Sequence, residues 1–122
     1  MKDNHSFSVR ARLRSFSYAF KGLWNFFRKE HNAWIHLFVT IIVVALGLYL
    51  HVSSSDWMAL SFAIGFVWAA ELFNTAIEKM ADHISPEQDA RIGMIKDLAA
   101  GAVLVAAMVA VIVGCIVFIP KF

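Results

Sequence analysis

Apolar residues along this chain gather into three long runs separated by short polar segments. The runs cover residues 33–50, 57–77 and 98–119. Each is close to the roughly 20 mostly apolar residues that a helix needs to cross a bilayer. The polar side chains that stand out inside them are His36 and Thr40 in the first run and Glu71 and Asn74 in the second. The pattern predicts three transmembrane helices.

The segment before these runs has a different period. Its large apolar residues recur every three or four positions and form one stripe: Leu13, Phe16, Phe20, Leu23, Trp24 and Phe27. Cations lie on an adjoining flank: Arg10, Arg14, Lys21 and Arg28. This pattern predicts an amphipathic helix over residues 7–29 that lies in the headgroup plane. The helix could serve as an anchor alone or take a direct part in a site, and the pattern leaves both possibilities open.

Composition supports a membrane protein. The 122 residues are 60% hydrophobic and 16% charged, whereas soluble domains average about 45–50% and 25%. A soluble helical bundle would need polar faces that these runs lack. Nucleic acid is a poor partner, because the cations adjoin a membrane-seeking face and no nucleic-acid motif accompanies them. We therefore expect one all-α integral membrane domain over residues 1–122.

The basic residues predict an orientation. Seven Lys and Arg precede the first run, residues 51–56 have none, and the second link contains Lys79, Arg91 and Lys96. The positive-inside rule then places the N-terminus and the second link in the cytoplasm. We expect transmembrane helices over 33–50, 55–82 and 96–119. The second would project into the cytoplasm before residues 85–87 (Ser-Pro-Glu) break it.

Polar groups converge on that cytoplasmic side. One face of the second transmembrane helix carries Glu71, Asn74, Thr75, Glu78 and Asp82. Near the same membrane face lie Glu30, Glu87, Gln88, Asp89, Lys96 and Asp97. Carboxylates suit Mg²⁺ when phosphates and water supply its other ligands, and a lysine can hold phosphate. These are the parts of a phosphoryl-transfer site, although the chain has no Walker loop or glycine-rich kinase loop.

Other interpretations of the polar stripe stay open at this point. Glu71 and Asn74 could form polar contacts between helices. Glu71 could instead couple proton flux in a small transporter or a ring subunit. The histidines do not share a spacing that would build a zinc site.

Three segments carry a resemblance to a known family. They are A-E-L-F-N-T-A-I-E-K-M-A-D at 70–82, K-D-L-A-A-G-A-V at 96–103, and Y-A-F-K-G-L at 18–23. With these the whole chain resembles the prokaryotic diacylglycerol kinases, small integral-membrane lipid kinases that include an undecaprenol kinase branch. The resemblance implies a homotrimeric bundle with sites shared between subunits. It also implies ATP as co-substrate, Mg²⁺ as cofactor, and a cytoplasmic active site in a bacterial inner membrane.

The resemblance also implies residue roles. Glu71 matches the general base at the lipid hydroxyl, and Asn74 would orient Glu71 or the phosphates. Glu30 and Glu78 match the carboxylates that hold the metal. The positions implied to contact ATP are Tyr18, Glu30, Glu78, Glu87, Gln88, Asp89, Lys96 and Asp97. Arg14 is a candidate for the basic contact to substrate, because the register places Ala11 where the best-known branch has an arginine.

The expected substrate is diacylglycerol, which would become phosphatidic acid. Undecaprenol is the alternative, because E-H-N-A-W-I-H at 30–36 looks more like the branch found in Gram-positive bacteria. Ala100 also replaces a serine that lies near the lipid in the best-known branch.

Overall fold

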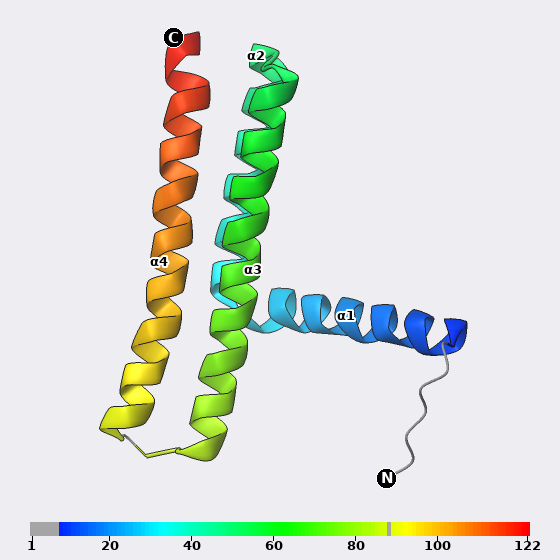
Figure 1. Cartoon of the computed structure of the whole chain (residues 1–122), viewed down its shortest axis with the longest axis vertical. Helices are drawn as coiled ribbons and strands as arrows, with labels where there is room; N and C mark the ends of the chain where they lie inside the picture. Colours follow the sequence, from blue (N-terminus) through cyan, green and yellow to red (C-terminus); the bar gives the residue numbers. More distant parts are fainter. Residues whose placement is uncertain (1–7, 88) are drawn as a thin grey trace. The chain divides into compact units, whose positions relative to one another are not determined.

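A computed structural model of the chain describes residues 8–87 and 89–122, and these residues contain helices and no strand. The helices are α1 (Val9–Lys29), α2 (His31–Leu50), α3 (Ser54–Ile84) and α4 (Ala90–Phe118), followed by the short 3-10 helix η1 (Ile119–Lys121) (Figure 1). The predicted all-α fold is therefore confirmed. The chain forms two compact units, Met1–Phe38 and Val39–Phe122.

In the first unit, α1 is the amphipathic helix that the sequence predicts. Ser8 caps its N-terminus, where the Ser8 hydroxyl accepts a hydrogen bond from the Ala11 N–H at 3.3 Å. Arg28 and Lys29 lie in the last turn, where cations interact favourably with the helix dipole. The apolar stripe stays exposed, Phe16 and Phe20 included, except at Phe27, which is half-buried. An exposed stripe of this kind suits a helix that lies on a bilayer.

In the second unit, α3 begins with a capping box. The Asp56 N–H donates to the Ser53 hydroxyl at 3.1 Å, and the Ser53 N–H donates to the Asp56 carboxylate at 3.3 Å. Two N–H groups that the helix cannot satisfy itself are thereby paired. At its other end α3 stops at Ile84, just before Pro86. The helix starts one residue before the expected position 55, and it ends just before residues 85–87, where the sequence predicts a break.

The third transmembrane helix begins earlier than expected. The sequence pattern placed its start near Lys96, but α4 begins at Ala90. The reason is Asp89, whose carboxylate accepts hydrogen bonds from the N–H groups of Arg91 at 2.8 Å and Ile92 at 3.4 Å. Aspartate is among the best N-cap residues, so it can start a helix before the apolar run begins.

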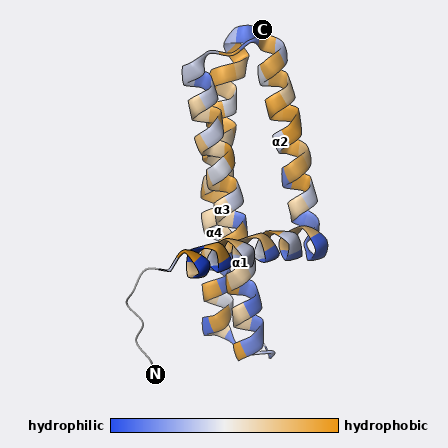
Figure 2. Ribbon diagram, turned by 90° about the vertical axis from the view of Figure 1, so that its right-hand side faces the viewer, coloured by the Kyte–Doolittle hydropathy of each residue, from blue (hydrophilic) through white to orange (hydrophobic). Residues whose placement is uncertain are grey.

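Helices α3 and α4 pack along each other, and small residues bring them close (Figure 1). Ala63 and Ala81 are buried on α3, as are Ala99 and Ala106 on α4. Among the residues that the structure describes, three helices are long and apolar enough to cross a membrane: α2, α3, and α4 extended by η1 to Lys121. Figure 2 shows hydrophobic residues along most of α2, α3 and α4. Large apolar side chains such as Phe62, 77% exposed, point outward, which suits lipid contact in a membrane protein.

The contact between Gly47 of α2 and Trp57 of α3 sets up a stability prediction. A Cβ added at Gly47 would lie 2.7 Å from the Trp57 ring, whereas one added at Gly65 would meet no atom within 4 Å. We expect Gly47→Ala to destabilise the protein by about 1–3 kcal/mol through overpacking. Gly65→Ala, the control, should be neutral or slightly stabilising because alanine favours helix. Thermal unfolding in detergent micelles, followed by circular dichroism, measures both; equal midpoints would contradict the packing argument.

Candidate functional site

The polar stripe of α3 holds the one charged residue that is buried among those the structure describes. Glu71 is only 5% exposed. One turn further along, the Asn74 side-chain amide donates to the Glu78 carboxylate at 3.1 Å. The Asn74 amide oxygen is buried and has no hydrogen-bond partner within the described part of the chain. The stripe therefore offers a buried carboxylate, an oriented carboxylate and an acceptor oxygen along one helix.

The end of α3 and the start of α4 are joined by an ion pair. The Lys96 ammonium donates to the Asp82 carboxylate at 2.7 Å. Lys96 is also attracted by the charge of Glu78, more weakly than by that of Asp82. The Lys96 ammonium thus lies beside acidic groups of α3, and its ion pair with Asp82 connects the polar stripe of α3 to α4.

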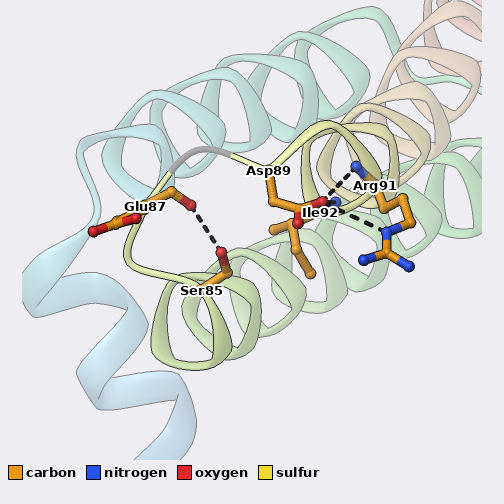
Figure 3. Close-up of polar contacts among 5 residues, drawn as sticks. All are labelled: Ser85, Glu87, Asp89, Arg91 and Ile92. Carbon is orange, nitrogen blue, oxygen red and sulfur yellow. Dashed lines mark hydrogen bonds and ion pairs between the residues drawn. The ribbon is translucent and has the colours of Figure 1, made fainter.

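A cavity of about 600 Å³ opens beside this ion pair. The link is shaped by the Ser85 hydroxyl, which donates to the Glu87 carbonyl at 2.8 Å, and by the Asp89 cap (Figure 3). Residues from both helices and the link line the cavity: Asp82, Ser85, Pro86, Glu87, Asp89, Ala90, Ile92, Gly93, Lys96 and Asp97. A cavity with one ammonium and several carboxylates suits a ligand that brings phosphate together with a cation.

The structure brings four predicted nucleotide contacts to this one cavity: Glu87, Asp89, Lys96 and Asp97. Glu71 is not among the residues that line it. Gln88 lies outside the described residues. Asp89 has a second role, because its carboxylate also caps α4.

Three predicted site residues belong to the first unit. Arg14 and Tyr18 are exposed on α1, and the Lys21 ammonium lies 5.9 Å from the centre of the Tyr18 ring, a cation–π distance. Glu30 follows α1 as its C-cap, and its N–H donates to the Phe26 carbonyl at 3.1 Å. This cap holds the Glu30 backbone at the junction between α1 and α2.

Sequence reasoning missed two pairings. It placed Asp82 on the polar stripe but did not pair it with Lys96, to which Asp82 is bound by an ion pair. It also noted Thr40 without its partner, the indole N–H of Trp68, which donates to the Thr40 hydroxyl at 3.0 Å. The sequence contains a signal for the second pairing: a polar residue interrupts the first apolar run, and an indole that can donate a hydrogen bond lies in the second run.

The donor set fits a hard cation. Within the residues that the structure describes, no three His, Cys, Asp or Glu side chains gather as a ready-made metal cage. Mg²⁺ does not need such a cage, because it is commonly bound by one or two carboxylates plus substrate phosphates and water. Glu78, whose carboxylate accepts a hydrogen bond from Asn74, is a carboxylate of the second unit that fits this kind of binding.

Comparisons with known proteins agree with one family. Residues 17–118 match the family model described as Prokaryotic diacylglycerol kinase. The chain is 34% identical to undecaprenol kinase of Bacillus subtilis over 97% of this chain and 96% of that protein. It is 37% identical to diacylglycerol kinase of Synechocystis, over 88% of this chain and 62% of that protein. It is 31% identical to diacylglycerol kinase of Escherichia coli K12, over 90% of each.

Proposed function

The chain belongs to the prokaryotic diacylglycerol kinase family, and from this premise we propose that it transfers the γ-phosphoryl group of ATP to diacylglycerol at the inner face of a bacterial membrane. Family membership makes the chain a lipid kinase that uses ATP as co-substrate. The interpretation of Glu71 as the coupling residue of a transporter or a ring subunit thereby loses its basis.

The observation that carries the mechanism is the burial of Glu71 on the stripe that leads to Lys96. A lipid hydroxyl lies at headgroup depth, whereas ATP cannot enter hydrocarbon. Glu71 is 5% exposed. Seven residues further along the helix, about 10 Å by helical rise, lies Glu78, one turn before Asp82, which pairs with Lys96. The stripe is thus suited to join a buried hydroxyl to an aqueous triphosphate.

Each group then has a defined task. The hydroxyl oxygen attacks the γ-phosphorus, its proton passes to the Glu71 carboxylate, and the bond between the γ-phosphorus and the bridging oxygen breaks to release ADP. Lys96 and Asp97 bind the nucleotide in the cavity together with Glu87 and Asp89. Glu78 and Glu30, which match the metal-holding carboxylates of the family, would hold Mg²⁺, and the ion would supply positive charge to the phosphates. Catalysis is mostly positioning and charge stabilisation.

The proposal extends to assembly and orientation. The excess of Lys and Arg in the N-terminal segment and in the second link supports a cytoplasmic site. We propose a homotrimer in which neighbouring subunits share sites, as the family resemblance implies. Within a trimer, residues of α1 such as Tyr18 and Arg14 would contribute to nucleotide and substrate binding.

Undecaprenol is the second candidate substrate. It is favoured by the match to the Bacillus subtilis undecaprenol kinase, which covers nearly the full length of both chains. Ala100 on α4 offers no hydroxyl to a glycerol headgroup, which also suits a plain polyprenol.

A direct assay decides between them. Purified protein in mixed micelles, with labelled ATP and Mg²⁺, receives diacylglycerol, undecaprenol, or both in equal amounts. We expect labelled phosphatidic acid, and in the competition at least about a tenfold preference for diacylglycerol, which corresponds to roughly 1.4 kcal/mol. Labelled undecaprenyl phosphate as the main product would replace the first candidate by the second. No labelled lipid with either alcohol would overturn the proposed function.

A further inference from the structure

One polar contact inside the apolar spans has no place in the mechanism so far. The indole N–H of Trp68 on α3 donates to the hydroxyl of Thr40 on α2 at 3.0 Å. Apolar neighbours flank both residues along the chain, and both side chains are partly buried. With no water in hydrocarbon to replace a lost partner, such a bond is costly to break. It therefore holds the register of α2 against α3.

The bond lies on the side of α3 that carries Glu71. Trp57, whose ring lies against Gly47 of α2, precedes Trp68 by 11 residues and Glu71 by 14. At about 3.6 residues per turn these separations are close to three and four whole turns. Trp57, Trp68 and Glu71 thus form one stripe along α3, and Glu71 follows Trp68 by a single turn.

Helix α3 makes its closest backbone contacts with α4, not with α2. The rotation of α3 relative to α2 therefore depends on side chains that reach across, and Trp68, one turn from Glu71, supplies a directional contact of this kind. Losing that contact would let α2 shift along α3 without unfolding either helix. A shift of about 1 Å at a reacting group can cost roughly 10²-fold in rate.

We propose that the Trp68–Thr40 hydrogen bond positions Glu71 for proton transfer, so that Trp68 and Thr40 are positioning residues of the kinase. This inference rests on the proposed role of Glu71 as the base. It concerns kcat, because neither residue lines the cavity assigned to the nucleotide.

Kinetic variants test the bond directly. Thr40→Val keeps the shape and removes the hydroxyl, and Trp68→Phe keeps a ring and removes the donor. Each should lower kcat about tenfold while the KM for ATP changes less than about twofold. Thr40→Ser restores the hydroxyl and should restore kcat. The double variant Thr40→Val/Trp68→Phe should lose no more than either single variant, because both remove the same bond.

The matched control is Trp57→Phe, which alters the tryptophan on the same stripe that contacts α2 through its ring. Its kcat should stay within about twofold of the parent chain. An equal loss in Trp57→Phe, an unchanged kcat in Thr40→Val, or no rescue by Thr40→Ser would each overturn the inference.

A second readout does not depend on lipid phosphorylation. A hydrophobic carbodiimide labels carboxyl groups in apolar surroundings, and Glu71→Gln provides the blank. The labelling rate of Glu71 should change several-fold in Thr40→Val and Trp68→Phe but not in Thr40→Ser. Identical labelling rates in the parent chain, Thr40→Val, Trp68→Phe and Thr40→Ser would contradict the positioning role. This test is independent of the proposed function, which fails separately if the parent chain phosphorylates neither alcohol.

Discussion

Glu71→Gln should leave a folded, membrane-inserted protein that turns over roughly 10³-fold more slowly than the parent chain. Glutamine has nearly the shape of glutamate, so the packing around this buried position is kept. What is lost is the oxygen that accepts the hydroxyl proton as the new bond to phosphorus forms. General-base catalysis contributes about 10²–10⁴-fold, and the KM for ATP should change little because the nucleotide cavity does not include this residue. Initial rates with labelled ATP in mixed micelles measure the loss.

Asp56→Asn is the matched control for this variant. Asp56 lies at the opposite end of the same helix, where its carboxylate completes the capping box. The asparagine side-chain oxygen can still accept the hydrogen bond from the Ser53 N–H, so kcat should stay within about twofold of the parent value. Near-normal phosphorylation by Glu71→Gln would remove Glu71 from the role of base and return it to the alternative of a polar contact between helices.

Much of the fold follows from properties that a sequence displays locally. The three apolar runs predict helices because the polar groups of backbone in hydrocarbon must bond within the helix itself. The first two runs lie inside α2 and α3, and the third lies in α4 with its extension η1. The two ends of α3 also follow from residues that are neighbours in sequence. A capping box of Ser53 and Asp56 starts the helix, and Pro86 follows its C-cap residue, Ser85. The Asn74–Glu78 bond also joins residues four apart on one face. Its two partners were both predicted site residues.

The contacts that sequence reasoning missed join helices. The pairing of Lys96 with Asp82, 14 residues apart, depends on how far α4 extends toward the link. That length in turn depends on a cap at Asp89, in a segment read as a loop. The pairing of Trp68 with Thr40, 28 residues apart, depends on the register between α2 and α3. No local rule fixes a register of this kind, because a slip of one turn leaves the apolar pattern unchanged.

Glu78→Gln should raise the Mg²⁺ concentration needed for half-maximal activity by at least about tenfold, since even residues outside the ligand shell of a metal contribute about 10–100-fold to its affinity. The glutamine carbonyl can still accept the hydrogen bond from Asn74, so the local structure of α3 is preserved while the charge that attracts Mg²⁺ is removed. Titrating Mg²⁺ at fixed ATP, at diacylglycerol concentrations well above KM, measures the shift.

The conservative variant separates charge from shape in this experiment. Glu78→Asp keeps the carboxylate on a shorter stem, so its Mg²⁺ requirement should lie between those of the parent chain and Glu78→Gln. Asp56→Asn again serves as the unaffected control, because its site at the start of α3 is about 33 Å of helical rise from position 78. A Mg²⁺ requirement unchanged in Glu78→Gln would exclude this residue as a metal ligand. Glu78 would then act through Lys96, on which its charge and that of Asp82 both act. In that case Glu78→Gln would raise the KM for ATP at saturating Mg²⁺.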